Sequence, residues 1–274
     1  MRMIGFIGTG AMGSAIMRGV ISAGLVAASD VVCSDHDAAA AKALSEELGV
    51  RAVASNAEVV TAVGAGVTIL AVKPPVVASV LAEIREAAAA AGTVIASIAT
   101  GTPIAALAAG LEPSQPIVRV MPNVAAQVGA GVAALCPGAG VTAAQLGAVR
   151  AVFEAVGIAL EVPEKDFSAF AAIAGCSPAW TFAYIDALSR GALAAGMRKD
   201  DSLRIAAQAV LGSAQLALQA LDSSIRPQAL IDTVTSPGGT TIAGLIAAER
   251  EGFSNATVAA VTAAIARDQE IASS

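Results

Sequence analysis

The first half of the chain alternates short apolar runs with longer stretches of helical spacing. The apolar runs predict buried strands at Met3–Ile7, Val31–Ser34, Val67–Val72, Thr93–Ser97, Ile117–Val120 and Ile158–Val162. Between them, apolar residues recur three or four positions apart and predict helices at Ala11–Ala23, Ala38–Leu48, Pro74–Ala90 and Ala143–Val156. Strands separated by helices of this length pair in parallel through right-handed crossovers. This half therefore predicts an α/β fold with a doubly wound (Rossmann-type) parallel sheet.

The pattern changes after the short segment Val162–Lys165. From Asp166 onward there is no convincing strand pattern, only long helical periodicity. The predicted helices are Ala169–Ala195, Asp200–Leu221, Thr241–Arg250 and Thr257–Ile271. We therefore predict a sheet domain over residues 1–163, followed by an all-helical C-terminal domain over residues 164–274.

The composition is strongly apolar, which raises the question of a membrane. Hydrophobic residues make up 56% of the 274 residues, aromatic residues only 3%, and the mean hydropathy is +0.72. Two runs, Ala87–Leu111 and Val120–Val149, carry no charge and are long enough to span a bilayer. Both are interrupted by prolines and glycines and are rich in Ala rather than Leu. They predict buried strands and Ala-faced helices, and we expect no membrane association.

The net charge indicates which class of partner to expect, and the cysteine content indicates the compartment. The formal net charge is −6 and no Lys/Arg cluster occurs, which argues against a nucleic-acid-binding surface. The start, MRMIGFIG, is too short and too quickly glycine-rich for a signal peptide. The three cysteines lack CxxC spacing, and their odd number fits a reducing cytoplasm. The sequence predicts a cytoplasmic protein with a small-molecule partner.

The segment GFIGTGAMGSAI places Gly8, Gly10 and Gly13 between the first predicted strand and the first predicted helix. GxGxxG spacing alone is a weak signal in a chain with 26 glycines, but this position makes it strong. The tight turn, the close approach of a pyrophosphate and the packing of helix on strand each require a missing Cβ. Free N–H groups at the helix start, near Ala11 and Met12, would bind phosphates. The loop predicts a dinucleotide-binding domain; the alternative is a tight turn without a ligand.

The second predicted strand leads into Ser34-Asp35-His36. An acidic residue here accepts hydrogen bonds from the ribose, and Asp35 would repel a 2′-phosphate, which slightly favours NADH. Ser34 and His36 could still donate hydrogen bonds to such a phosphate. We expect Ser34 and Asp35 to lie at the cofactor, and the choice between NADPH and NADH stays open. A solvated loop position is an equal interpretation for His36.

Several residue types and motifs are missing from the sequence, and this limits the classes of reaction that the protein could catalyse. His36 is the only histidine, which excludes histidine-dependent metal clusters and argues against a Ser-His-Asp hydrolase. Tyr184 is followed four positions later by Leu188, so the Tyr-x-x-x-Lys pair of short-chain dehydrogenases is missing. Only Lys73 among the four lysines sits at the carboxyl end of a predicted strand. A reductase with so few acids and bases suits an activated electrophile such as a protonated C=N bond.

Four stretches resemble the pyrroline-5-carboxylate reductases of proline biosynthesis. They are GFIGTGAMGSAI, ILAVKPP, VRVMPNVAAQVGAG and TVTSPGGTTIAGL, in the family's order and across nearly the whole chain. The last stretch, Thr233–Leu245, is the most specific. The resemblance implies NAD(P)H-dependent reduction of the C=N bond of 1-pyrroline-5-carboxylate to L-proline. Two alternatives stay open: a reductase of a related pyrroline-2- or piperideine-carboxylate, and a non-catalytic NAD(P)-binding redox sensor.

In this family the Ser-Pro-Gly-Gly-x-Thr segment lines the substrate pocket at a helix N-terminus. By resemblance, N–H groups near Gly238, Gly239 and Thr240 would bind the substrate carboxylate. Ser236 would assist them. Thr241 would hydrogen-bond the imine or amine nitrogen and relay a proton from water. The alternative interpretation is an ordinary N-cap turn.

The resemblance also implies roles elsewhere. Ala71, Lys73 and Pro74 would border the nicotinamide, and Asn123 would lie beside the cofactor or the substrate. A solvated loop lysine is an equal alternative for Lys73. The family commonly packs as dimers through the helical domain, often assembled into rings of dimers. Residues 164–274 would therefore bind substrate and form a homodimer.

The chain departs from the family's pattern in three places. The usual Asn-Thr-Pro reads Asn123-Val124-Ala125, which loses a hydroxyl near the cofactor. The usual Gly-x-Gly-Pro-Ala-Tyr opening of the central helix ends in Trp180, a core residue or a pocket wall. Asp35 stands where many members carry basic or amide residues, which leaves the cofactor preference open.

Overall fold

The structure is a computed structural model that describes residues 3–273. The chain divides into two compact units. The first runs to Gly175 and includes the residues from Ile265 onward, and the second is Cys176–Ala264. The predicted domain boundary after Pro163 falls inside the first unit. It stays a prediction, because compactness does not show which segment folds independently.

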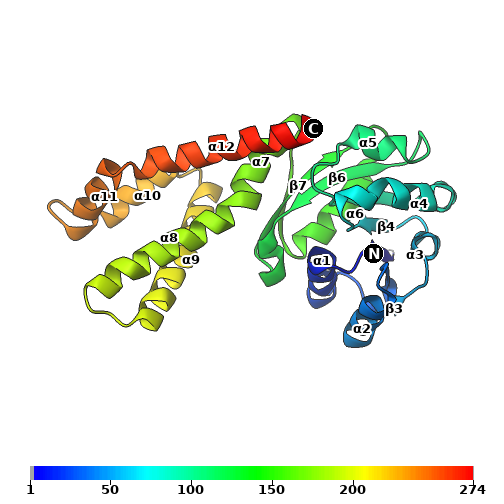
Figure 1. The fold of residues 1–274 in the computed structure, drawn as a ribbon, viewed down its shortest axis with the longest axis horizontal. Coiled ribbons are helices and arrows are strands. Elements are labelled where there is room, and N and C mark those ends of the chain that lie inside the picture. The colour runs from blue at the N-terminus through cyan, green and yellow to red at the C-terminus, as the bar shows by residue number, and fades with distance from the viewer. Residues whose placement is uncertain (1–2, 274) are drawn as a thin grey trace. The chain divides into compact units, whose positions relative to one another are not determined.

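The first unit is built on a single eight-stranded sheet (Figure 1). Its strands are β1 (Ile4–Ile7), β2 (Val31–Ser34), β3 (Arg51–Ala52), β4 (Val67–Leu70), β5 (Val94–Ser97), β6 (Ile117–Pro122), β7 (Gly131–Pro137) and β8 (Gly157–Glu161). Their order is β3-β2-β1-β4-β5-β6-β7-β8. The chain therefore starts at β1, winds out through β2 to β3, and returns to the other side of β1 at β4. This reversal is the defining feature of a doubly wound sheet.

One neighbouring pair departs from the predicted parallel pairing. β6 and β7 run antiparallel, with Pro122 opposite Ala133, whereas the other six pairs are parallel. The two strands are joined by the 3-10 helix η3 (Val124–Val128) and a left-handed turn at Gly129. A parallel crossover needs about a dozen residues or more, so this short connection can only turn the chain back.

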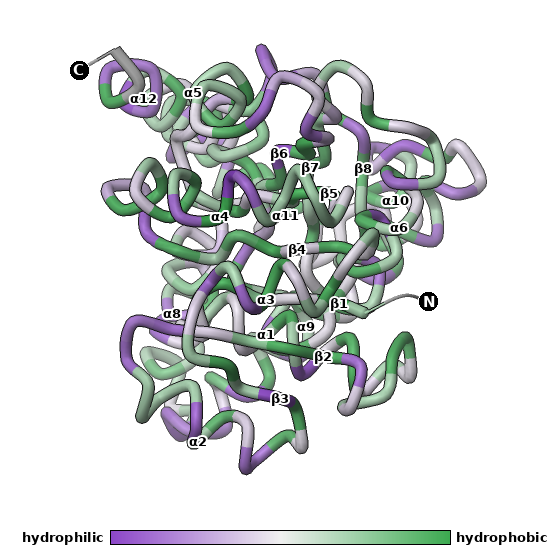
Figure 2. Tube along the Cα trace, turned by 90° about the vertical axis from the view of Figure 1, so that its right-hand side faces the viewer, coloured by the Kyte–Doolittle hydropathy of each residue, from purple (hydrophilic) through white to green (hydrophobic). Residues whose placement is uncertain are grey.

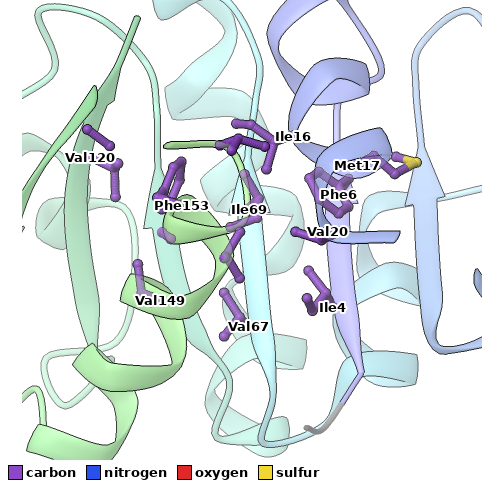
Figure 3. Packing of buried hydrophobic residues seen from close by; sticks show 14 of the residues in the cluster. Ile4, Phe6, Ile16, Met17, Val20, Val67, Ile69, Val120, Val149 and Phe153 are labelled. Atoms are coloured by element: carbon purple, nitrogen blue, oxygen red, sulfur yellow. The ribbon is translucent and has the colours of Figure 1, made fainter. Parts of the chain in front are cut away.

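Helices cover both faces of the sheet. They are α1 (Ala11–Ser22), α2 (Ala38–Leu48), α3 (Asn56–Val63), α4 (Val77–Ala91), α5 (Ile104–Ala109) and α6 (Ala143–Glu154). One apolar cluster joins α1, α2 and α6 to strand residues such as Phe6 and Ile69, and Figure 3 shows Phe153 of α6 within it. A second cluster joins α3, α4 and α5 to the next residues along these strands, Ile7 and Leu70. Because successive side chains point to opposite faces of the sheet, the strands contribute residues to both apolar clusters.

The central strands are buried along their whole length. The segments IGFI, VVCS, VTIL and VIAS are buried at every residue, and the tube at β4 has the colour of hydrophobic sequence in Figure 2. Continuous burial is typical of parallel strands with helices on both faces. This is why short uninterrupted apolar runs were enough to predict them.

The rest of the described chain is helical. After β8 come η4 (Glu164–Asp166), α7 (Phe167–Phe170), a π-helix (Ala171–Cys176), α8 (Ser177–Ala194), α9 (Lys199–Asp222), α10 (Pro227–Val234), α11 (Thr240–Arg250) and α12 (Phe253–Ser273). Within the second unit, the buried hydroxyls of Ser189 and Ser202 lie 2.6 Å apart between α8 and α9. Large apolar side chains stay exposed there, including Phe182 at 66% and Val258 at 65%. Exposed apolar surface of this kind marks an association surface.

These elements confirm the predicted fold class, a doubly wound sheet followed by an all-helical region. The segments 166–273 contain no strand, as the sequence predicted. The sequence pattern missed β3, β7, α3, α5 and α10, which are short or rich in small residues. Across residues 3–273, no helix combines the length and the apolar character that crossing a membrane requires.

The close pairing of β7 with β8 depends on Gly157. Its φ is +152°, and a Cβ there would collide with the carbonyl oxygen of Gly131 on β7. We expect Gly157→Ala to lower the free energy of unfolding by about 3 kcal/mol, because strain and backbone collision add. Chemical denaturation at fixed protein concentration measures the change.

Gly147 offers a matched control within α6. A Cβ there meets no atom within 4 Å and the residue is exposed, so Gly147→Ala should stabilise the helix by about 0.5–1 kcal/mol. Equal losses in the two variants would contradict the assignment of the effect to the β7–β8 contact.

Candidate active site

The glycine loop leaves the carboxyl end of β1 between two neighbouring strands. The N–H of Gly8 donates to the Ser34 carbonyl of β2 at 2.9 Å, and the N–H of Ala71 donates to the Ile7 carbonyl at 2.8 Å. Gly8 has φ +102°, and a Cβ there would lie 2.5 Å from the carbonyl oxygen of Ala71. A Cβ on Gly13 would collide with the carbonyl oxygen of Gly8. Both glycines are therefore required by the packing of the protein itself.

Gly10 differs from the other two glycines of the loop. A Cβ at this position would meet no atom within 4 Å, so the fold places no demand on it. Gly10 is the N-cap of α1 and provides no side-chain acceptor for the first-turn N–H groups, which include those of Ala11 and Met12. An open cradle with free N–H groups at a helix N-terminus fits a dinucleotide pyrophosphate.

A cavity of about 310 Å³ opens at this edge of the sheet. It is lined by Gly10, Ala11, Met12, Ala71, Val72, Lys73, Pro74, Ile98, Thr100, Met121 and Pro122. The structure thus brings together most residues that were predicted to border the cofactor. The lining from the ends of β5 and β6 was not predicted. These positions also lie at the carboxyl ends of strands, where ligands of open α/β sheets bind, so the predicted strands Thr93–Ser97 and Ile117–Val120 could have indicated them.

Lys73 is the one charged residue that lines this cavity within the described part of the chain. It is exposed and caps the 3-10 helix η2 (Pro74–Val76) with extended backbone. None of the ion pairs formed by the described residues involves Lys73. The side chain is therefore available to a phosphate or to solvent, and both interpretations of Lys73 stay open.

A larger hollow of about 700 Å³ lies on another side of α1, where η3 and the end of α6 meet that helix. Its lining includes Ser14, Arg18, Gln127 and Val128, and only Ala11 among the predicted site residues. Among the described residues that line it, none lies at the carboxyl end of a strand. We therefore place the candidate active site at the smaller cavity, where the glycine loop and the strand ends converge.

Asp35 lies beside the glycine loop, and its oxygens already accept hydrogen bonds within the protein. Oδ2 accepts from the N–H of Thr9 at 2.6 Å and from its hydroxyl at 2.9 Å. Oδ1 accepts from the N–H of Asp37 at 3.0 Å and lies 2.7 Å from Nδ1 of His36. Asp35 therefore fixes Thr9, the residue between Gly8 and Gly10, in addition to any contact with a ribose.

These hydrogen bonds also set the charge of Asp35. Burial raises the pKa of this carboxyl, but the N–H groups of Asp37 and Thr9 and the Thr9 hydroxyl outweigh burial and hold the pKa below its usual value. Asp35 is thus ionised at neutral pH. A negative charge beside the glycine loop opposes binding of a 2′-phosphate.

Ser34 has a hydrogen-bond partner for its hydroxyl within the protein. Its side chain is buried, and its hydroxyl donates to Oδ1 of Asn56 at 2.7 Å. Asn56 in turn donates from Nδ2 to Glu83 at 2.6 Å. Ser34 does not line the cavity. A role for Ser34 at the cofactor stays a prediction, and its link to Asn56 and Glu83 has no local signal in the sequence.

Asn123 follows the cavity wall at the end of β6 without lining the cavity itself. Its carboxamide bonds the carbonyl of Ala174 at 3.1 Å and the N–H of Val132 at 3.0 Å. Both partners are backbone groups of the first unit. The predicted contact of Asn123 with cofactor or substrate stays a prediction.

The second unit holds the Ser-Pro-Gly-Gly segment in a tight turn before α11. The N–H of Gly239 donates to the carbonyl of Ser236 at 2.9 Å, and Gly238 has φ +70°. Proline followed by a glycine with positive φ is the signature of a type II turn. Gly239 caps α11 without a side-chain acceptor, so the first N–H groups, including those of Thr240 and Thr241, remain for a ligand or solvent.

The predicted substrate residues are accessible in this turn. Ser236, Gly238, Thr240 and Thr241 are exposed, and Gly239 is half-buried. A Cβ on Gly239 would meet the Ser236 hydroxyl, which would then have to rotate away from its present position. The turn can present backbone N–H groups and three hydroxyls to a small anion. The assigned roles of these residues stay predictions.

Two family models match the chain. Residues 3–113 match "NADP oxidoreductase coenzyme F420-dependent", and residues 164–271 match "Pyrroline-5-carboxylate reductase dimerisation". The first match covers the glycine loop and strands β1 to β5. The second covers the helices that carry the exposed apolar side chains and the Ser-Pro-Gly-Gly turn.

Relatives with this name match the whole length. The pyrroline-5-carboxylate reductase of Methanosarcina acetivorans is 40% identical over 268 residues, which cover 98% of this chain and 97% of the relative. That of Escherichia coli K12 is 34% identical over 273 residues, covering 100% and 99%. Among solved structures, the enzyme from Coxiella burnetii has a TM-score of 0.91 at 28% identity and covers 98% of both chains. The enzyme from Plasmodium falciparum, with NADP bound, has a TM-score of 0.84 at 28% identity and covers 99% of this chain and 98% of its own. These similarities confirm the resemblance seen in four stretches of the sequence.

Adding a methyl group at Gly10 and at Gly13 leads to different expected outcomes. We expect the free energy of unfolding of Gly10→Ala to lie within about 0.5 kcal/mol of that of the parent, because the added Cβ touches no protein atom. Its affinity for NADH and NADPH should fall at least about tenfold, because the methyl occupies the approach of the pyrophosphate. Isothermal titration calorimetry measures the affinity, and chemical denaturation measures the stability.

Gly13→Ala is the matched comparison, because there the Cβ collides with the loop backbone. It should lose both stability and affinity. Parental affinity in Gly10→Ala would show that no ligand approaches the loop closely.

Proposed function

Since the chain belongs to the pyrroline-5-carboxylate reductase family, we propose that it reduces the C=N bond of 1-pyrroline-5-carboxylate to give L-proline. The observation that carries the proposal is the cavity where the glycine loop meets the strand ends. It joins a cradle for a dinucleotide to an apolar wall, with Lys73 as the one charged lining residue among those described. Such a site suits hydride transfer to an electrophile that arrives already activated.

In this proposal the residues of the chain bind the cofactor, bind the substrate and orient its nitrogen. The glycine loop and the α1 N–H groups hold the pyrophosphate, and Ala71, Lys73 and Pro74 border the nicotinamide. When bound, the reduced nicotinamide supplies a hydride to the imine carbon, and the imine nitrogen gains a proton. Backbone N–H groups of the Ser236–Thr240 turn hold the substrate carboxylate. The Thr241 hydroxyl orients the nitrogen and passes on a proton from water, since its own pKa is too high for direct acid catalysis.

Asp35 makes NADH the preferred cofactor in this proposal. Its carboxylate is ionised, only 10% of its side chain is exposed, and Thr9 holds it beside the loop. A 2′-phosphate would meet this charge at short range, whereas a ribose hydroxyl could donate to it. NADPH would bind through the same loop with lower affinity.

The proposal extends to assembly and compartment. The exposed apolar side chains of the helical unit support a homodimer, and further assembly of dimers into a ring follows the family's pattern. Cys33, Cys136 and Cys176 are free thiols, which supports a reducing cytoplasm as the compartment.

The reaction is tested by adding 1-pyrroline-5-carboxylate to the purified protein with NADH or NADPH. We expect loss of nicotinamide absorbance and formation of L-proline. Thr241→Ala should lower kcat about a hundredfold while the dissociation constant for the cofactor stays unchanged, because the hydroxyl acts on the imine nitrogen.

Thr61→Ala provides the control for the Thr241 variant. Thr61 is exposed on α3, and its hydroxyl only bonds the Ala57 carbonyl of its own helix. This variant should keep the parental rate. If Thr241→Ala reduces the imine at the parental rate, the assigned role of Thr241 is wrong. No turnover by folded, cofactor-bound parent protein would redirect the proposal to another cyclic imine or to a redox sensor.

Asp35→Asn tests the proposed cofactor preference. The amide keeps an acceptor for Thr9 and loses the charge, so the ratio of kcat/KM for NADPH to that for NADH should rise about tenfold, or about 1.4 kcal/mol. Steady-state kinetics with both cofactors measure the ratio. Asp30→Asn, which removes a charge from the 3-10 helix before β2, should leave it unchanged. An unchanged ratio in Asp35→Asn would remove Asp35 as the source of preference.

A further inference from the structure

The carboxamide of Asn123 joins three segments of the first unit. Nδ2 donates to the carbonyl oxygen of Ala174 in the π-helix at 3.1 Å, and Oδ1 accepts from the N–H of Val132 in β7 at 3.0 Å. A backbone carbonyl only accepts and an N–H only donates. The position therefore requires a side chain that offers a donor and an acceptor at once.

The backbone explains why this side chain is needed at Asn123. The Asn123 carbonyl accepts from the N–H of Ala126 in η3, and the side-chain oxygen instead accepts from the N–H of Val132, one position beyond the Pro122–Ala133 pair. Pro178 stands four positions after Ala174 and has no N–H for an α-helical bond to the Ala174 carbonyl. The Asn123 amide donates to that carbonyl.

The two residues before Asn123 form part of the candidate active site. Met121 and Pro122 line the cavity of about 310 Å³, together with the glycine loop. Met121 also reaches the π-helix, because a Cβ on Gly175 would lie 3.6 Å from its Cε. The position of this wall is therefore set by the same π-helix that the Asn123 amide bonds.

We propose that Asn123 is a positioning residue for hydride transfer. By bonding Ala174 and Val132, it holds Met121 and Pro122 at the distance from the glycine loop that the nicotinamide and the imine require. It acts through the backbone and does not touch the reacting atoms. This role rests on the proposed reductase function, and it is distinct from the predicted contact of Asn123 with cofactor or substrate.

Asn123→Asp tests the donor without changing the shape of the side chain. An ionised carboxylate still accepts from Val132 but faces the Ala174 carbonyl with a second acceptor, whereas a protonated carboxyl donates again. At about pH 8 we expect kcat to fall about tenfold to a hundredfold relative to the parent. The deficit should shrink severalfold as the pH falls toward about 5, through the titration of the new carboxyl. Asn123→Ala should be deficient at every pH, and both variants should bind NADH within about twofold of the parent.

Hydrogen exchange of the Val132 amide gives a readout that does not depend on turnover. The amide should exchange faster than in the parent in Asn123→Ala, which removes its acceptor, and should stay protected in Asn123→Asp. This measurement remains readable if the parent chain fails to reduce the imine. A failure of the proposed function is thereby distinguished from a failure of the positioning role.

Gln127→Glu is the control for charge. It places a carboxylate on an exposed residue of η3, four positions further along the chain, and its pH profile should follow the parent. Three outcomes would overturn the proposal: a cofactor affinity at least about tenfold weaker in Asn123→Asp with Val132 still protected, a pH-independent deficit in that variant, or an equal deficit in Gln127→Glu. The first of these would assign Asn123 to direct cofactor binding.

Discussion

The backbone of Gly8 passes so close to the carbonyl of Ala71 that no side chain fits between them, and the architecture of the site depends on this approach. β1 lies between β2 and β4. The carbonyl of Ile7, its last residue, accepts from the N–H of Ala71 after β4, and the N–H of Gly8 donates to the carbonyl of Ser34 in β2. The chain leaves β1 at the point where the strand order reverses. The helices that follow β1 and β4 cover opposite faces of the sheet, which leaves a crevice at this edge. The position of α1, and with it the cavity, follows from a turn that only glycine can make.

The opposite wall of the cavity is fixed by two polar side chains on either side of Met121. Arg119, with 14% of its side chain exposed, pairs with Glu164 at 2.9 Å and lies 4.4 Å above the Phe167 ring. Glu164 also accepts from the N–H of Ile104 at 2.7 Å. Asn123 bonds the π-helix a few residues beyond Phe167. The end of β6 is therefore tied at two points to the segment that follows β8. Removing Glu164 would leave the largely buried charge of Arg119 without its partner.

The parts of the fold that could be predicted from the sequence are those with a local signal. β1, β4 and β5 are apolar runs buried on both faces, so composition and length identify them. β7 was missed because GVAALCP lies inside a long uncharged run of small residues and lacks β-branched enrichment. The uses of Asp35 and Asn123 could not be predicted either. Thr9 lies 26 positions from Asp35 and Ala174 lies 51 positions from Asn123, and only the folded chain brings these groups together. A residue type indicates which bonds a side chain can make, but not which partner it meets.

The same distinction applies to the glycine triplet that first suggested a dinucleotide. Gly8 and Gly13 are explained by contacts within the protein, so a chain that bound nothing would still need them to bring α1 onto β1 and β4. Gly10 has no such explanation, since a side chain there would point into open space. A ligand in this loop is therefore indicated by Gly10, the one glycine of the triplet that the fold does not require. The turn before α11 differs from the glycine loop. Gly238 supplies the positive φ of the turn, and a Cβ on Gly239 would press mainly on the Ser236 hydroxyl, a group that can rotate. Substrate binding in this turn is therefore indicated by the uncapped N–H groups of α11 and by the hydroxyl of Thr241.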